Sequence, residues 1–209
     1  MTILIILSVI FISAAVVSIW SKYKHRSIYK FAKLIPVSVL ILFLLIKDSQ
    51  FTVFRILIIF ALVFSLIGDY FLLHPETKFK YGLISFMIAH IFYSTAFINE
   101  VNTYNWYLVL PVLFYSILFL KYLGNEIENY KIPVYLYTLV ISVMLWSSLN
   151  GFYSLNGMQE KLILAGGILF VFSDSALAIN KFKRKFKFAE FTILGSYYAA
   201  QLLFALSVN

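Results

Sequence analysis

The chain has 209 residues, of which 62% are hydrophobic and only 12% are charged, and its mean hydropathy is +0.91. Soluble domains are about 45–50% apolar and about 25% charged, so this chain has too little polar surface to cover a water-soluble fold. The high hydrophobicity also excludes intrinsic disorder, and the absence of cysteine excludes disulfides and thiolate nucleophiles. The composition predicts an integral membrane protein.

Eight apolar segments follow one another along the chain. They cover residues 3–20, 34–46, 55–73, 82–98, 106–120, 133–149, 162–179 and 189–207. A membrane-spanning helix needs about 20 residues, so the second segment is short, although Pro36 near its start suits a first helical turn. None of the segments alternates between polar and apolar residues, as the strands of a membrane β-barrel do. We expect an all-α polytopic bundle of eight transmembrane helices that forms a single membrane domain over residues 1–209.

The basic residues indicate the orientation of this bundle. All but three of the 17 Lys and Arg residues lie in the first, third, fifth and seventh loops, and the exceptions are Lys47, Arg55 and Lys161. The positive-inside rule predicts that these four loops are cytoplasmic and that both termini are outside. The first segment has no positive residue before it, so it is not a cleavable signal peptide. The net charge of +8 therefore mainly reflects the orientation of the protein in the membrane. For the basic cluster 181–187, the alternative role is contact with lipid headgroups or with a substrate phosphate.

Two acidic residues, Asp69 and Asp174, lie inside apolar segments. A carboxylate at the centre of a membrane helix costs about 2.5–3.5 kcal/mol on insertion scales, so it needs a partner, a water-filled cavity or a function. In the predicted orientation, Asp69 and Asp174 lie about 6 Å and about 7.5 Å from the cytoplasmic ends of their segments. We therefore expect the two carboxyl groups at similar depth. A structural hydrogen bond between helices is the alternative for each of them.

Further polar residues recur at helical spacing in two other segments. Gly82, Phe86, His90, Tyr93 and Phe97 share one face of the fourth segment, and Glu190, Tyr197 and Gln201 share one face of the last, with Tyr198 beside them. We expect these faces to converge with Asp69 and Asp174 in the cytoplasmic half. For His90, a structural role in the core is the alternative.

The two aspartates also mark an internal repeat. Asp69 precedes Tyr93 by 24 residues, and Asp174 precedes Tyr198 by the same number. The offset between the two halves is about four helices, and an even number of helices relates repeats of parallel orientation. The sequence thus suggests a four-plus-four parallel repeat.

Four motifs together resemble the YhhN-like lysoplasmalogenase family. These are GDYFLL from residue 68, GLISFMIAHIFY from 82, GGILFVFSDSALAINKF from 166 and SYYAAQLLFALS from 196. The resemblance covers essentially the whole chain. It implies that Asp69, Asp174, His90, Tyr93, Tyr197, Tyr198 and Gln201 are site residues, and Ser173 and Asn180, from the motif of Asp174, complete the set. One departure concerns Lys33, which is separated from Pro36 by two residues where the family places Pro directly after a Lys, so a role for Lys33 stays open.

The resemblance implies hydrolysis of the vinyl-ether bond of a lysoplasmalogen, or of a related lyso-ether lipid, to a fatty aldehyde and a glycerophospho-alcohol. This reaction needs an acid that protonates carbon and an anion near the resulting oxocarbenium ion. Two carboxyl groups in a poorly solvated site can divide this work, as in glycosidases, because burial and mutual repulsion favour the protonated form of one of them. We therefore expect Asp69, Asp174 and His90 to be catalytic, without assigning which aspartate is the acid.

The expected substrate-binding residues are Tyr93, Tyr197, Tyr198, Gln201, Ser173 and Asn180. We expect no metal, no cofactor and no nucleic-acid partner. The expected partners are a lysophospholipid substrate and membrane lipid, and the oligomeric state is left open. A mixed metal site of His90 with both aspartates is the less favoured chemical alternative.

Other function classes share some of these features. Intramembrane Asp and His also build proton-coupled transporters of small solutes, and a non-catalytic lipid-binding protein would have the same composition. An intramembrane aspartyl protease is disfavoured, because Leu66 occupies the first glycine position of its Gly-x-Gly-Asp pattern.

Overall fold

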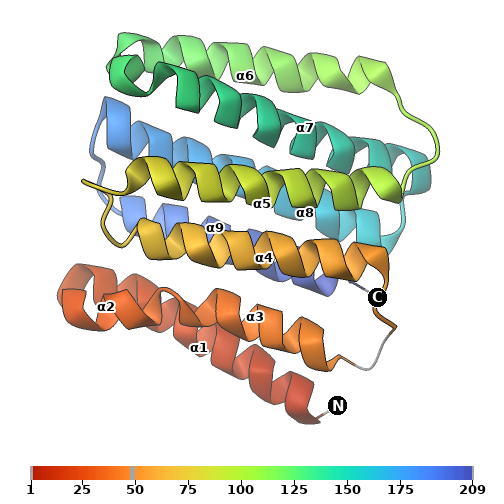
Figure 1. The fold of residues 1–209 in the computed structure, drawn as a ribbon, viewed down its shortest axis with the longest axis horizontal. Helices are drawn as coiled ribbons and strands as arrows, with labels where there is room; N and C mark the ends of the chain where they lie inside the picture. Colours follow the sequence, from red (N-terminus) through yellow and green to blue (C-terminus); the bar gives the residue numbers. More distant parts are fainter. Residues whose placement is uncertain (1, 48–49, 209) are drawn as a thin grey trace.

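The computed structural model describes residues 2–47 and 50–208, and within these ranges the chain is helical without any β-strand (Figure 1). Its elements are α1 (Thr2–Lys24), α2 (Arg26–Ala32), α3 (Ile35–Ile46), α4 (Val53–Phe71), α5 (Phe79–Asn99), η1 (Trp106–Leu108), α6 (Val109–Leu123), η2 (Gly124–Tyr130), α7 (Lys131–Leu155), α8 (Met158–Ala178), η3 (Ile179–Lys183) and α9 (Ala189–Leu206). Here η1 and η2 are 3₁₀-helices and η3 is a single π-helical turn that continues α8.

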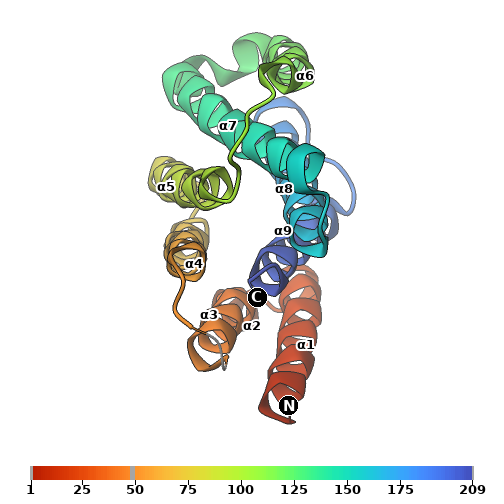
Figure 2. The ribbon, with the colours of Figure 1, turned by 90° about the vertical axis from the view of Figure 1, so that its right-hand side faces the viewer.

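Two helical hairpins form the centre of the molecule. α4 packs against α5, and α8 packs against α9. Figures 1 and 2 show α1, α2 and α3 along one edge of this centre, and α6 and α7 along the other. The N- and C-termini lie at one end of the bundle, and the connections that carry the four basic segments lie at the opposite end (Figure 1).

Each of the eight apolar segments is helical, as the sequence predicts, and there are two additions. Residues 26–32 and 124–130, which the sequence analysis assigned to loops, form α2 and η2. Six segments of the described chain are long and apolar enough to cross a membrane: Ile6–Lys24, Ser27–Ile46, Val53–Phe71, Phe79–Asn99, Trp106–Leu155 and Met158–Lys183. The fifth contains both α6 and α7, and α9 is not among the six. The protein is thus a multi-pass helical membrane protein.

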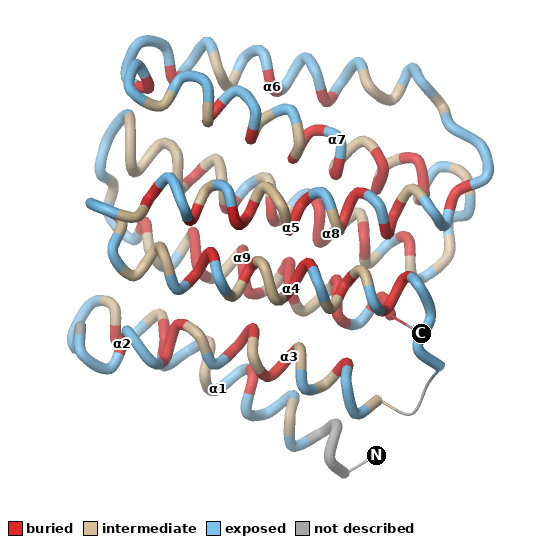
Figure 3. The backbone as a smooth tube through the Cα atoms, in the orientation of Figure 1, coloured by how far each residue is buried: buried red, intermediate tan, exposed pale blue. Residues whose placement is uncertain are grey.

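The outer surface is apolar, in contrast to that of a soluble bundle. Phe114 and Ile117 on α6 and Val16 on α1 expose 67%, 62% and 61% of their surface. Buried residues concentrate on the facing sides of the central helices, whereas α6 is exposed along most of its length (Figure 3). Continuous exposed apolar surface of this kind is expected where lipid replaces water as the solvent.

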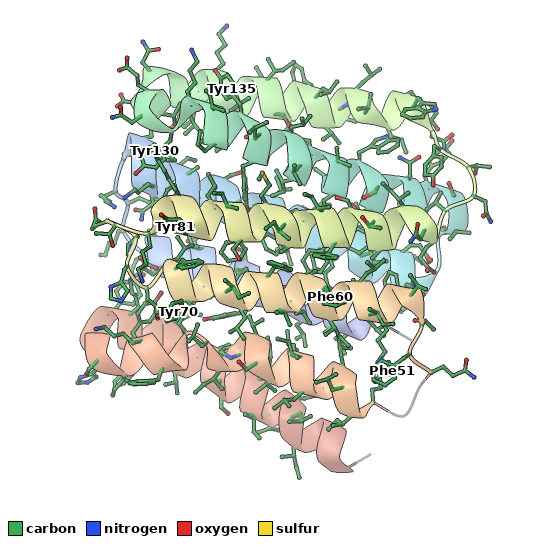
Figure 4. The ribbon with its side chains drawn as sticks, viewed as in Figure 1. Phe51, Phe60, Tyr70, Tyr81, Tyr130 and Tyr135 are labelled. Atoms are coloured by element: carbon green, nitrogen blue, oxygen red, sulfur yellow. The ribbon has the colours of Figure 1, made fainter. Side chains whose placement is uncertain are left out.

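Tyrosines accompany the basic residues at one end of the bundle. Tyr70, Tyr81 and Tyr130 lie at the end opposite the termini (Figure 4). The Lys78 ammonium lies 5.6 Å from the ring centre of Tyr70, and that of Lys80 lies 5.4 Å from the ring centre of Tyr130. Tyrosine and lysine are typical of the membrane–water interface, so this end has the chemistry of an interface.

A buried arginine fixes the turn between α3 and α4. Thr52 caps α4 by accepting a hydrogen bond from the Arg55 backbone N–H at 3.2 Å. The Arg55 side chain folds back and donates to the carbonyl oxygens of Leu44 and Lys47, which have no partner within α3. The Arg55 side chain therefore satisfies two carbonyl oxygens at the end of α3.

Glycines allow the central helices to approach closely. A Cβ atom on Gly166 of α8 would lie 2.6 Å from the ring of Phe204 on α9, and one on Gly68 of α4 would lie 2.6 Å from the ring of Phe86 on α5. Phe204 is fully buried, so its ring has no free space to move into. Small residues at such crossings are a general feature of membrane helix packing.

We predict that Gly166→Ala destabilises the protein by about 1–3 kcal/mol, because the added methyl overpacks the α8–α9 contact. Gly195→Ala is the matched control, since a Cβ there meets no atom within 4 Å. Thermal unfolding of the purified variants in detergent measures both effects, and equal stability of the two variants would contradict this account of the contact.

Candidate active site

Asp69 lies in a buried ion pair near the end of α4. Its side chain is 3% exposed, and its Oδ1 lies 3.2 Å from the Lys33 Nζ. The Tyr197 hydroxyl, from α9, donates to Asp69 Oδ2 at 2.7 Å. Lys33 is itself only 5% exposed and lies at the break between α2 and α3. A lysine counter-ion and a tyrosine hydroxyl thus both favour the ionised form of Asp69.

Tyr198 holds the backbone of Lys33 in place. Its hydroxyl donates to the Lys33 carbonyl oxygen at 3.1 Å and accepts from the Ser18 hydroxyl at 2.8 Å. Lys33 Nζ also donates to the Asp69 carbonyl oxygen at 3.3 Å. The sequence analysis counted Lys33 only as a loop charge with an open role, and the structure makes it the partner of Asp69.

Asp174 on α8 has a different environment. Its Oδ2 accepts a hydrogen bond from the Tyr137 hydroxyl of α7 and lies 3.3 Å from His90 Nε2 of α5. His90 Nε2 is also 2.9 Å from the Tyr137 hydroxyl. The Asp174 side chain is 17% exposed, and its Oδ1 makes no hydrogen bond to any described residue. No lysine or arginine pairs with Asp174 in the described chain, so it lacks the fixed counter-ion that Asp69 has.

Both aspartates line one pocket, which we call the polar pocket. Lys33, Tyr29 and Tyr197 line it with them, and so do Ser173 and Asn180 of the predicted substrate-binding set. Its volume is about 110 Å³. Its other charged residues form two ion pairs, Lys22–Glu190 at 3.3 Å and Lys181–Glu76 at 3.8 Å, together with the exposed Lys185. The π-helical turn of η3 supplies Asn180 and Lys181, and such turns are frequent at functional sites.

A second pocket, of about 70 Å³, adjoins the first, and we call it the apolar pocket. Apolar side chains from α5, α6, α7, α8 and η3 form most of its wall, together with Leu72 just after α4. Asp174 is the only charged residue among the described residues that line it. The two pockets share Leu72, Phe79, Phe86, Asp174 and Leu177. Asp174 therefore stands where the polar pocket passes into the apolar one.

Three residues of the predicted substrate-binding set lie outside both pockets. Tyr93 is fully buried and donates a hydrogen bond to Gln201 Oε1, in a core that includes Phe204 and Phe170. Neither Tyr93, Gln201 nor Tyr198 lines either pocket. The face of α5 that contains Gly82, Phe86, His90, Tyr93 and Phe97 is buried, as the sequence predicts. It contributes to the hydrophobic core as well as to the site.

Sequence reasoning missed Tyr137 altogether. Two tyrosines, Tyr135 and Tyr137, occur in the same apolar segment, and the sequence offers no reason to choose between them. In the structure Tyr135 is exposed and Tyr137 is buried against Asp174.

His90 and the two aspartates do not form a metal-binding group. Within residues 2–47 and 50–208, no three His, Cys, Asp or Glu side chains are grouped so as to hold a metal ion. The contacts of His90 are instead with Tyr137 and Asp174.

Comparison with known proteins relates the chain to one group of membrane proteins. It is 36% identical over 148 residues to the mouse protein called lysoplasmalogenase TMEM86B, covering 70% of this chain and 61% of that protein. It is 31% identical over 187 residues to bovine lysoplasmalogenase TMEM86A, covering 84% of this chain and 75% of that protein. An uncharacterised membrane protein YhhN of Escherichia coli O157:H7 is 23% identical over 175 residues, covering 83% and 84%.

The chain thus spans about three-fifths of the length of the mouse relative. No solved structure matches it. The sequence model of the YhhN family matches residues 28–208, a range that includes Lys33, Asp69, His90, Tyr137 and Asp174. The protein therefore belongs to the YhhN family.

Proposed function

We propose that this protein is an ether hydrolase of the membrane that cleaves the vinyl-ether bond of a lysoplasmalogen or a related lyso-ether lipid. The observation that carries the proposal is that two aspartates with unlike partners, Asp69 and Asp174, line one pocket. The relatives named lysoplasmalogenases support the substrate class. The products would be a fatty aldehyde and a glycerophospho-alcohol.

The unlike partners assign a role to each carboxyl group. Asp69 is paired with Lys33 and Tyr197, which both favour its carboxylate form, so we assign it to stabilise a cation. Asp174 has no fixed counter-ion, and its Oδ1 is not engaged. When protonated on Oδ1, Asp174 can still accept the hydrogen bond from Tyr137 on Oδ2. We assign Asp174 as the acid and Asp69 as the anion.

The reaction then proceeds in three steps. Asp174 donates its proton to the β-carbon of the vinyl ether, which leaves an oxocarbenium ion that the Asp69 carboxylate stabilises. Water from the polar pocket attacks the α-carbon and gives a proton back to Asp174, which has changed from acid to base as in retaining glycosidases. The resulting hemiacetal breaks its bond to the glycerol oxygen, and its hydroxyl proton passes to that oxygen. One water molecule is consumed overall.

His90 and Tyr137 position the acid. Both contact Asp174 Oδ2, so they fix the rotamer of the carboxyl group and leave Oδ1 for the substrate. Asn180 lines the polar pocket and is suited to the glycerol and headgroup. Ser173 and Tyr197 also line it, and their hydroxyls donate to the Ile193 carbonyl oxygen and to Asp69. Tyr93, Tyr198 and Gln201, which lie outside it, act through packing and through Lys33.

The first prediction concerns turnover. Asp69→Asn and Asp174→Asn each lower the rate of aldehyde release from a lysoplasmalogen by about 10²–10⁴-fold, because each removes one half of the carboxyl pair. Purified protein is assayed with the vinyl-ether lipid and with its saturated ether analogue, which lacks the double bond that accepts the proton.

Glu126→Gln is the matched control for these variants, since Glu126 pairs only with Lys183 at 3.8 Å and lines neither pocket. It keeps wild-type activity. Wild-type turnover in either aspartate variant would remove that residue from the mechanism, and cleavage of the saturated ether would exclude carbon protonation.

A second prediction concerns the charge on Asp69. Lys33→Met destabilises the protein by about 3–5 kcal/mol, because it leaves a buried carboxylate without its counter-ion. The double variant Lys33→Met with Asp69→Asn removes both charges and recovers much of this loss, which thermal unfolding in a double-mutant cycle measures. Additive effects of the two substitutions would show that the two groups are not coupled.

The transmembrane topology is part of the same proposal. We propose that α6, α7 and α9 each cross the membrane, which gives eight spans with α1, α2–α3, α4, α5 and α8. The basic residues and interfacial tyrosines at one end support a cytoplasmic location for that end, with both termini outside. The polar pocket would then face the inner leaflet.

This topology can be tested because the chain contains no cysteine. Asn102 and Lys187 are exposed at opposite ends of the bundle. Single cysteines introduced at these two positions report on the two sides of the membrane. A membrane-impermeant thiol reagent added to intact cells labels the cysteine at position 102 and not the one at 187. The reverse labelling pattern would invert the orientation.

The internal repeat is likewise a proposal. Asp69 lies on the first helix of the α4–α5 hairpin and Asp174 on the first helix of the α8–α9 hairpin. Each aspartate contacts the second helix of the other hairpin, through Tyr197 and His90 respectively. This reciprocal arrangement supports a duplicated four-helix unit.

A further inference from the structure

The apolar pocket has a wall that offers almost nothing to a polar ligand. Its serine and threonine hydroxyls already have hydrogen-bond partners in the protein. Thr138 donates to the Val134 carbonyl oxygen and Ser175 to that of Val171. Ser116 and Ser142 lie within hydrogen-bond distance of the carbonyl oxygens of Val112 and Thr138 and of each other. The Tyr115 hydroxyl is hydrogen-bonded to Ser175 Oγ at 2.7 Å. The remaining wall is aliphatic and aromatic, apart from Asp174 and its partner Tyr137.

The pocket extends along α6 and α7, away from Asp174. On α7 its wall continues from Tyr137, which contacts Asp174, through Ile141 to Leu145. Tyr137 and Leu145 are eight residues apart, which corresponds to about 12 Å along the helix axis. These positions share one face of α7, because they are spaced four residues apart.

Two residues line the far end of this pocket. The hydrogen bond of 2.8 Å between Ser116 and Ser142 sets the register of the antiparallel helices α6 and α7. Val112 lies one turn before Ser116, and Leu145 lies about one turn after Ser142, so both stand at the same level. Both line the pocket, Val112 is 3% exposed, and no residue of the next turn on α7 lines it.

We propose that the apolar pocket binds the hydrocarbon chain of the substrate and that Val112 and Leu145 limit the length of chain it accepts. This inference rests on the proposed function for the class of lipid, and it goes beyond it in naming the chain site and its length determinants. A single unbranched chain fits a narrow apolar groove whose hydroxyls are satisfied, whereas a polar group inside it would lose its hydrogen bonds to water. With the chain in the apolar pocket and the headgroup in the polar pocket, the vinyl ether between them lies beside Asp174.

The test changes the depth of the pocket and measures chain preference. Leu145→Trp fills the far end, so it lowers kcat/KM for long-chain lysoplasmalogens by about tenfold or more relative to short-chain ones, whereas the wild type prefers the longer chains. Leu139→Trp is the matched control, because Leu139 is on the same helix, is 59% exposed and does not line the pocket. It leaves the chain preference unchanged.

Binding is measured separately from turnover with saturated alkyl ether analogues of increasing chain length, which the enzyme does not cleave. A ligand that binds only the folded protein raises its melting temperature. In the wild type this rise grows with chain length, and in Leu145→Trp it stops growing at a shorter chain. Val112→Phe provides the same obstruction from α6 and serves where the tryptophan variant fails to fold.

The outcomes separate the two proposals. The chain site is supported if the ether analogues raise the melting temperature more as their chains lengthen, and if this increase stops at a shorter chain in Leu145→Trp. If the wild type shows this binding but releases no aldehyde, only the proposed reaction is contradicted. Aldehyde release with the same chain preference in wild type, Leu145→Trp and Val112→Phe would overturn the chain site and leave the reaction standing.

Discussion

The structure is built around the cost of burying two carboxyl groups in a helical bundle with an apolar surface. An unpaired charge at this depth is unfavourable by several kcal/mol, so each aspartate has polar partners from other helices. The two aspartates have different partners. Asp69 is neutralised by a lysine that is as deeply buried as itself, whereas Asp174 has only a tyrosine and a histidine, and this histidine is charged only when protonated. In the proposed mechanism this asymmetry lets two residues of the same type act as an anion and as an acid.

The arrangement of the helices follows from the need to bring these partners together. The hairpins α4–α5 and α8–α9 supply both aspartates, together with His90 and Tyr197. The break between α2 and α3 directs Lys33 toward Asp69, and Tyr198 holds the backbone at this break. The helices at both edges of the bundle therefore contribute to the site, α2–α3 with the counter-ion of Asp69 and α7 with the tyrosine that contacts Asp174.

The helices and the two aspartates were predictable from the sequence because hydropathy is a property of consecutive residues. A charge in a long apolar run is visible without knowledge of the fold. Lys33 was not predictable in its role, because it stands at the end of a basic segment that also satisfies the positive-inside rule. Its burial depends on the helix α2, which the sequence analysis assigned to a loop. Tyr93 and Gln201 were predicted to bind substrate because they lie on inward faces of their helices. Such a face contributes to the hydrophobic core as well as to the pocket, and only the tertiary packing decides which residues line the pocket.

The central proposal is that Asp174 is the acid of the reaction and Asp69 is its anion. Infrared spectroscopy tests this directly, because a protonated carboxylic acid and a carboxylate absorb at different frequencies. The account predicts that the wild-type protein has a carboxylic acid C=O band that is lost in Asp174→Asn and kept in Asp69→Asn. A band that is lost in Asp69→Asn and kept in Asp174→Asn, or no such band in the wild type, would contradict it.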